Sequence, residues 1–208
     1  MDIQQISVLR DNIETALTLL IKKIGPIQIG DSKQFPYGWR KAAKGRTVWR
    51  IIEEVITQNL EYFHSDFNLD SVVPSDSEVS VYDMKCTSQG VDAYINIKSA
   101  VINAKNSKDD ISKAEGLLAF YNVDPDRQFF VATFFIKFNH NMTINIDKVV
   151  VFPVAWISDV YVNPSNNGNL QSAHYKDLKD AAKRTNQEFI KLLKSAKSLA
   201  DKKKKDKK

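Results

Sequence analysis

The hydrophobic residues near the start of the chain recur every three or four positions. Over residues 2–23 the recurring positions are Ile3, Ile6, Leu9, Ile13, Leu17 and Leu20. Over residues 40–63 they are Trp49, Ile52, Ile56, Leu60 and Phe63. Because an α-helix repeats about every 3.6 residues, each segment is predicted to be an amphipathic helix. The segment 25–38 between them contains Gly and Pro at several positions, which predicts a loop.

The middle of the chain changes to patterns that are typical of β-strands. The runs 79–86 (VSVYDMKC) and 91–99 (VDAYINIKS) flank the sequence TSQG, which predicts an antiparallel hairpin. The continuous apolar run 128–138 is typical of a buried central strand. Residues 148–157 form a further predicted strand, which bends or ends near Pro153.

More polar segments complete the order of elements. Residues 65–78 are expected to be irregular or to hold a short strand, and 107–121 to form a helix that begins at a Ser cap. Residues 161–175 are expected to be a polar loop, and 176–200 a charged helix. This order predicts an α/β fold in which helices flank a mixed sheet, rather than a doubly wound sheet.

One domain is expected over residues 1–200, and 1–38 form its N-terminal helix and loop. The Lys-rich segment 201–208 (DKKKKDKK) is predicted to be a disordered tail. The chain has a formal charge of +5, but this tail holds six Lys and two Asp, so the remainder carries only +1. Net charge alone therefore gives little reason to expect a nucleic-acid partner.

Composition and missing motifs exclude several classes of protein. With 43% hydrophobic residues, seven Gly and six Pro, the chain is neither collagenous nor disordered. The single Cys86 excludes an intramolecular disulfide, and His64, His140 and His174 lack metal-ligand spacing. There is no GxGxxG or GxxxxGK[ST], so no nucleotide cofactor is expected. No signal peptide or long apolar run is present, so we expect a cytoplasmic protein that does not enter membranes.

The predicted hairpin carries the residues with the most chemical potential. In a hairpin that turns at 87–90, Asp83 faces residues 94–96, and the side chains of residues 92, 94, 96 and 98 share one face. Asp83, Asn96 and Lys98 are therefore expected to converge. Oxygen ligands suit Mg²⁺, and a Lys beside the metal can handle an attacking water and offset charge on a phosphate. The ordinary alternative is a solvent-facing hairpin with cross-strand ion pairs.

The segment resembles the motif of the PD-(D/E)xK nuclease superfamily, in which an Asp precedes an Asp/Glu-x-Lys by about a dozen residues. The matching residues are Asp83 and Asn96-Ile97-Lys98. Tyr82 stands where the family usually has Pro, and Asn96 replaces the second acid. The resemblance implies that Asp83, Asn96 and the Ile97 carbonyl hold Mg²⁺, and that Lys98 acts on the water and the phosphate.

Two further acidic residues could compensate for the missing acid at position 96. Asp92 is expected on the same face as Asn96 and is a candidate metal ligand. Glu53 lies at the edge of the apolar face of the helix 40–63, and the superfamily often draws an acid from the equivalent helix. The simpler interpretation of Glu53 is a surface charge.

A second resemblance concerns the segment 166–178 (NNGNLQSAHYKDL), which is similar to the DNA-reading loop of type II restriction endonucleases of the EcoRV and HincII kind. It implies that Asn166, Asn167 and Gly168 approach base edges while Asn169 supports the loop. It also implies phosphate contacts or loop support from the residues His174 and Lys176. An ordinary polar turn is the alternative.

A rival placement of the catalytic motif uses Asp66, Asp83 and Lys85, and has a true carboxylate before its Lys. It requires an additional strand between Lys85 and the helix that follows, so the Lys98 placement is favoured. Asp83 belongs to both placements.

Together the two resemblances predict a Mg²⁺-dependent type II restriction endonuclease that cleaves double-stranded DNA at a specific, palindromic sequence. Residues 39–200 would form its catalytic and DNA-reading core. A homodimer is expected because a palindrome has two-fold symmetry, and the helix 2–23 is a candidate dimer element. A structure-selective or repair nuclease of the same superfamily, or an inactive DNA-binding module, are the alternatives.

Overall fold

The computed structural model describes residues 1–39, 44–77, 79–104 and 108–206. Its helices are α1 (Ile3–Ile24), α2 (Lys44–Phe63), α3 (Ala114–Val123) and α4 (Asn186–Lys205). Its strands are β1 (Ile27–Gln28), β2 (Ser71–Pro74), β3 (Met84–Ser88), β4 (Val91–Val101), β5 (Asp109–Lys113), β6 (Gln128–Phe138), β7 (Thr143–Pro153), β8 (Tyr161–Asn163) and β9 (Asn169–Ser172). The predicted helix 40–63 is thus seen from residue 44, and 40–43 lie outside the described residues.

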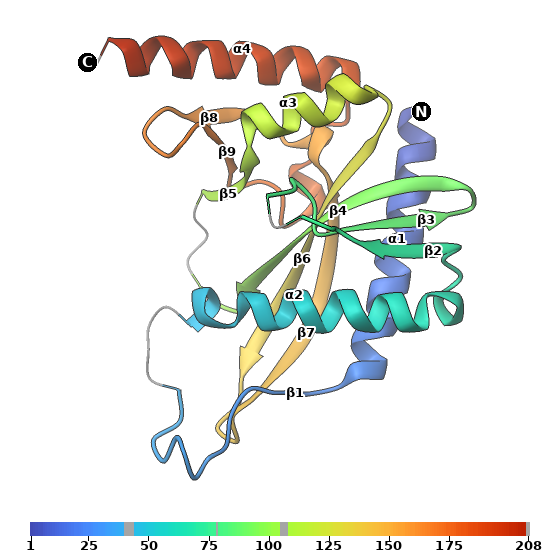
Figure 1. Cartoon of the computed structure of the whole chain (residues 1–208), viewed down its shortest axis with the longest axis vertical. Coiled ribbons are helices and arrows are strands. Elements are labelled where there is room, and N and C mark those ends of the chain that lie inside the picture. Colours follow the sequence, from blue (N-terminus) through green and yellow to red (C-terminus); the bar gives the residue numbers. More distant parts are fainter. Residues whose placement is uncertain (40–43, 78, 105–107, 207–208) are drawn as a thin grey trace.

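A six-stranded mixed sheet forms the centre of the molecule, in the order β1-β7-β6-β4-β3-β2 (Figure 1). Strands β4 and β6 run parallel, and the other neighbouring pairs are antiparallel. Strand β6 lies between β4 and β7 and is buried over most of its length. Its uninterrupted apolar run fits this position, because both faces of a central strand are covered. The predicted mixed sheet and its central strand are confirmed.

The predicted hairpin is strands β3 and β4. Its two turn residues, Gln89 and Gly90, both have positive φ (52° and 75°), as the tight hairpin turns require. The register pairs Met84 with Ile95, so the preceding residue Asp83 stands opposite Asn96, as predicted. Strand β3 begins only at Met84, although the Asp83 N–H still donates to the Ile95 carbonyl at 2.9 Å.

A second sheet, in the order β5-β9-β8, corrects two predictions. Residues 109–113 were expected to be helical, but they pair with β9 as strand β5, and α3 begins only at Ala114. The expected polar loop 161–175 contains the hairpin β8–β9. The hairpin turns at Asn167 and Gly168, both with positive φ, and the Asn169 N–H donates to the Asn166 carbonyl at 3.0 Å.

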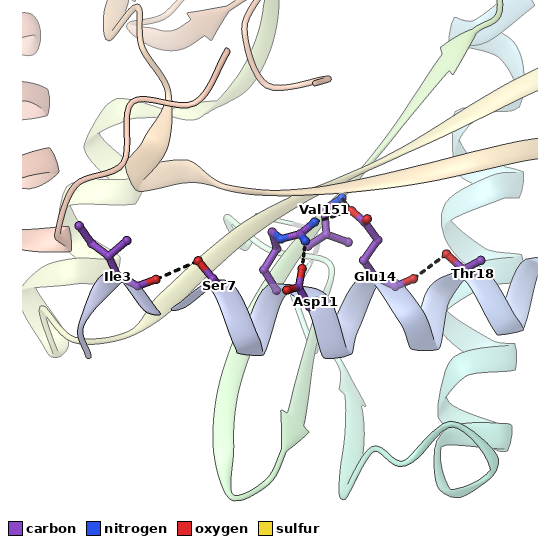
Figure 2. Close-up of polar contacts among 7 residues, drawn as sticks. Ile3, Ser7, Asp11, Glu14, Thr18 and Val151 are labelled. Carbon is purple, nitrogen blue, oxygen red and sulfur yellow. Dashed lines mark hydrogen bonds and ion pairs between the residues drawn. The ribbon is translucent and has the colours of Figure 1, made fainter. Parts of the chain in front are cut away.

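Helix α1 belongs to the hydrophobic core. It buries Ile6, Leu9, Ile13, Ala16, Leu17 and Leu20. Figure 2 shows Glu14 of α1 reaching β7, where its carboxylate accepts a 2.8 Å hydrogen bond from the Val151 N–H and also binds Arg10 at 2.9 Å. Helix α1 therefore packs as part of the domain, because its apolar face covers the sheet. Its role in dimerisation stays a prediction.

Helix α4 begins and ends later than the predicted 176–200. Thr185 and Glu188 form a reciprocal capping box at its start. Residues 201–205, predicted to be disordered, continue the helix, and 207–208 lie outside the described residues. The buried side chains of Phe189, Leu193 and Ala200 hold α4 on the core. Among the helices that the structure describes, none has the length and apolarity that crossing a membrane requires.

Candidate active site

A cleft of about 370 Å³ opens where β4 continues past the beginning of β3. Its lining includes all four predicted catalytic residues, Asp83, Asn96, Lys98 and Glu53, together with Ile97. Four further residues complete the lining, namely Trp49, Ser99, Asp109 and Tyr175. The cleft thus gathers side chains from α2, β4, β5 and the segment after β9.

The position of Asp83 follows from the unequal lengths of the two strands. Beyond Ile95 no strand of the described residues pairs with this edge of β4, and the Asp83 carboxylate takes the place of such a partner. Its Oδ2 accepts a hydrogen bond from the Ile97 N–H at 2.5 Å. The carbonyl of Ile97 points to the same edge, because the N–H and C=O of one residue in a strand share a side. The cleft therefore has a carboxylate and a carbonyl oxygen side by side.

Asn96 adds a third oxygen. Its Nδ2 donates to the Val81 carbonyl at 3.0 Å, which fixes the orientation of the amide. The residue is only 8% exposed, and its Oδ1 has no hydrogen-bond partner among the described residues. An unsatisfied buried acceptor costs about 1–3 kcal/mol. A buried acceptor that is oriented by its own amide and has no partner among the described residues is suited to binding a cation.

The pKa values of Asp83, Lys98 and Glu53 are shifted toward the neutral forms of these groups. Burial raises the pKa of Asp83, against the opposing effects of the Ile97 N–H, Lys98 and Arg50. Burial also lowers the pKa of Lys98, although the nearby Asp83 carboxylate opposes this shift most strongly. Such shifts are common where acids and bases act on a substrate, although structural ion pairs cause them too.

Glu53 belongs to the same electrostatic group. Burial raises its pKa, and the negative charge of Asp83 raises it further. Arg50 acts in the opposite direction from 3.5 Å away. The helix α2 therefore directs one partly buried acid toward the hairpin, as the helical periodicity predicted.

The oxygen set fits a hard cation. Mg²⁺ binds carboxylate, carbonyl and water oxygens and usually keeps several waters. In the described part of the chain, no three His, Cys, Asp or Glu side chains gather in a way that could hold a metal ion. A cation in this cleft would depend on Asp83 together with the neutral oxygens of Asn96 and Ile97, with Glu53 nearby.

Asp92, the other predicted metal ligand, lies apart from this group. It is four residues from Asn96 along β4, or about 13 Å at the rise of an extended strand. Its carboxylate accepts from the Thr87 hydroxyl at 2.7 Å and binds Lys85 at 3.2 Å. The structure therefore does not bring Asp92 to Asp83, and Asp92 forms the cross-strand contacts of the alternative interpretation.

The rival placement is not assembled either. Asp66 forms an ion pair with Lys23 of α1 at 2.7 Å. Lys85 is bound to Asp92, and neither Asp66 nor Lys85 lines the cleft that contains Asp83. The geometry therefore favours Lys98 as the basic residue.

The predicted DNA-reading residues form a folded hairpin rather than an open loop. Asn166 donates to both carboxylate oxygens of Asp110, at 3.0 and 2.8 Å, which ties the hairpin to β5. Asn167 and Gly168 form its turn, and Asn169 lies in β9 with a buried Oδ1 that has no hydrogen-bond partner in the described residues. Base contacts from this hairpin stay a prediction.

His174 and Lys176 follow β9 and have partners within the chain. His174 Nδ1 lies 3.5 Å from an Asp180 carboxylate oxygen. Lys176 binds Asp109 at 2.5 Å, and Lys176 therefore stabilises the carboxylate that lines the cleft. This contact fits the predicted supporting role, and phosphate contacts from these two residues remain untested.

Sequence reasoning missed the contribution of β5. Asp109 was assigned to the first turn of a helix, where acidic residues are common. Tyr175 lies opposite, with its hydroxyl 3.5 Å from Asp109, and burial followed by the charge of Asp109 raises the pKa of Tyr175. Only the pairing of β5 with β9 brings these residues to the cleft, and no local pattern in the sequence predicts this pairing.

No protein-family model matches the chain, and no curated protein matches it. Among solved structures, the chain is similar to "NlaIV restriction endonuclease", at 12% identity and a TM-score of 0.45. The similarity covers 77% of this chain and 72% of that chain. A likeness this distant does not assign a function, which rests here on the cleft.

Proposed function

We propose that this protein is a Mg²⁺-dependent endonuclease that hydrolyses phosphodiester bonds of double-stranded DNA at a specific sequence, as type II restriction endonucleases of the PD-(D/E)xK superfamily do. The observation that carries the proposal is the meeting of Asp83, Asn96 and Lys98 in one cleft, with the Asn96 Oδ1 oriented and without a partner in the described part of the chain. Asp83 directly precedes the first strand of the hairpin, and Asn96 and Lys98 lie in the second, in the order of that motif.

Each residue has a role that follows from its chemistry. Asp83, the Asn96 Oδ1 and the Ile97 carbonyl would hold Mg²⁺, which when bound supplies positive charge to a phosphate and lowers the pKa of water. Lys98 orients the attacking water, and its lowered pKa makes its Nζ more available to accept the proton. The water oxygen then bonds to phosphorus as one bond from phosphorus to a deoxyribose oxygen breaks. Glu53 adds negative charge beside the cation.

A homodimer belongs to the proposal, because a palindromic site presents the same sequence to two related subunits. The hairpin residues Asn166, Asn167 and Gly168 would lie toward the bases, and His174 and Lys176 toward the backbone. The proposal includes the similarity of this hairpin to the DNA-reading loop of type II restriction endonucleases of the EcoRV and HincII kind.

The decisive experiment is cleavage of phage DNA with Mg²⁺ by the wild type and by Lys98→Ala. Discrete, sequence-defined fragments are expected from the wild type. Lys98→Ala is expected to lose cleavage by at least about 100-fold, because general acid–base groups contribute 10²–10⁴-fold, while it still binds DNA. Lys85→Ala is the matched control, since Lys85 lies on the same hairpin outside the cleft and should leave cleavage intact.

The same experiment can contradict the proposal. Full cleavage by Lys98→Ala would exclude its catalytic role, and loss of cleavage in Lys85→Ala would favour the rival placement. Cleavage confined to branched or damaged DNA would indicate a repair nuclease.

A second function is favoured by one observation, the replacement of the second acid by Asn96. An uncharged ligand weakens metal binding, and a DNA-binding protein without catalysis would show specific binding but no cleavage at millimolar Mg²⁺. Fragment analysis over a Mg²⁺ titration separates the two functions.

A further inference from the structure

The positive charge of the chain is concentrated in one helix. Helix α4 contains seven Lys and two acidic residues, which equals the +5 of the whole chain. Residues 1–185 contain 21 basic and 22 acidic residues, so they carry a net charge of −1. Because residues 1–185 are close to neutral, α4 is the part of the molecule that would attract a polyanion.

The lysines of α4 form an ordered surface. The helix buries Phe189, Leu193 and Ala200, and the opposite side presents a row of exposed lysines, which we call the lysine stripe: Lys191, Lys194, Lys202 and Lys205. The residues of the stripe are three, eight and three positions apart, which keeps them on one face. From end to end the stripe is about 21 Å long, or about six base-pair steps of duplex.

The C-terminal part of α4 lies beside the hairpin β8–β9. Lys197 and Lys204 line a small cleft together with the turn residues Asn167 and Gly168. The same turn is hydrogen-bonded to β5 through the contact of Asn166 with Asp110. In Figure 1 the C-terminal end of α4 lies on the same side of the molecule as the β8–β9 turn, β5 and the first turn of α2.

We infer that the lysine stripe binds the phosphate backbone of duplex DNA next to the segment that occupies the cleft. The inference rests on the proposed function for the choice of partner. The stripe offers exposed ammonium groups at the length of several phosphates, and Ser198 on the same face can also donate to phosphate. An anionic membrane fits less well, because a membrane-bound helix buries its apolar face in lipid, and that face of α4 is already buried in the protein.

The test measures the salt dependence of DNA binding. The stripe variant carries Lys→Gln substitutions at positions 191, 194, 202 and 205, in the Lys98→Ala background so that the DNA stays intact. Binding to a fluorescent 30-bp duplex is followed by anisotropy between about 50 and 200 mM salt. Each lost phosphate contact lowers the slope of log K against log salt by about 0.9, so we expect a decrease of about 3 to 4 and an affinity loss on the order of 10- to 100-fold at low salt.

The matched control removes four exposed lysines outside α4, with Lys→Gln at positions 22, 33, 137 and 183. It should change the slope by less than about 1. Circular dichroism shows whether α4 stays helical in the stripe variant, and a double variant with Lys→Gln at 202 and 205 provides half the expected change if the fourfold variant unfolds.

The outcomes separate the inference from the proposed function. Equal slopes for the stripe variant and the wild type, or an equal decrease in the control, would overturn the inference even if the wild type cleaves DNA. Absence of cleavage by the wild type would refute the nuclease while leaving the slope comparison valid. Binding to phosphatidylserine vesicles that depends on the stripe, with no effect on DNA, would overturn the inference in favour of lipid.

Discussion

At the scale of single residues, the contacts of Asn96 give a physical reason for an amide rather than a carboxylate at position 96. Its amide nitrogen donates to the Val81 carbonyl, while its amide oxygen has no partner among the described residues. A carboxylate would face the Val81 carbonyl with no proton to share. The neutral side chain is therefore part of how this hairpin end is held.

Asn96→Asp is expected to destabilise the protein without metal by about 1–3 kcal/mol, because the Val81 carbonyl loses its donor and faces a charge. Mg²⁺ should then raise the melting temperature of the variant more than that of the wild type, since the added carboxylate binds the cation. Thermal unfolding with and without Mg²⁺ measures both effects. Equal melting temperatures without metal would show that the contact with Val81 contributes nothing.

Asp83→Asn should stabilise the protein near neutral pH while removing metal binding. Because burial raises the pKa of Asp83, the folded state holds its proton more tightly than the unfolded state, and wild-type stability falls as pH rises through that raised pKa. The amide stays neutral and can still accept from the Ile97 N–H. We expect a gain of a few degrees in melting temperature, about 1 kcal/mol for a chain of this size, at pH 7.5.

The pH dependence supplies the control for this prediction. As the pH falls from 7.5 toward the ordinary pKa of an Asp carboxyl, the wild-type carboxyl takes up its proton, so the gain from Asp83→Asn should shrink. A gain of the same size across this pH range would mean that ionisation of Asp83 is not its cause.

At the scale of elements, the sequence predicted the strands and helices whose patterns are local. The hairpin β3–β4 has its turn residues and alternating side chains within about twenty positions, so its register and the meeting of Asp83 with Asn96 could be predicted. Strand β5 is specified by pairing with β9, some sixty residues later, and its sequence DDISK resembles a helix start. Asp109 and Tyr175 were missed for the same reason.

The contact between α1 and β7 allows a test of how α1 is anchored to the sheet. Glu14→Ala leaves the Val151 N–H without its acceptor and should cost about 1–3 kcal/mol of unfolding free energy, measured in urea. Glu14→Gln keeps an acceptor oxygen and should recover most of the loss. Asp11→Ala is the control, since Asp11 is exposed and forms its ion pair with Arg10 rather than with the sheet. A loss of equal size in Asp11→Ala would assign the effect to helix charge instead.

At the scale of the whole molecule, the proposed dimer can be assigned to a surface. One side of α1 is buried, and its outer side exposes Val8 (44%) and Leu19 (41%), which are eleven positions apart and so lie on one stripe. If α1 joins two subunits, sedimentation should give twice the 23.7 kDa of the chain, and Val8→Glu with Leu19→Glu should give the mass of one chain.

The control for the dimer is Val123→Glu, because Val123 is exposed (69%) on α3. It should leave the mass unchanged. A dimer that persists in the α1 variant would place the interface elsewhere, and a monomer on palindromic DNA would refute the two-fold arrangement.

The separation of charge between α4 and the rest of the chain makes the molecule an electric dipole. In the field of any polyanion such a dipole is turned before contact, with α4 toward the anion. Productive encounters would then outnumber random ones, and the bimolecular association rate would fall as ions weaken the field. Helix α4, whose C-terminal end was predicted from the sequence to be a disordered tail, would thereby orient the molecule as it approaches its target.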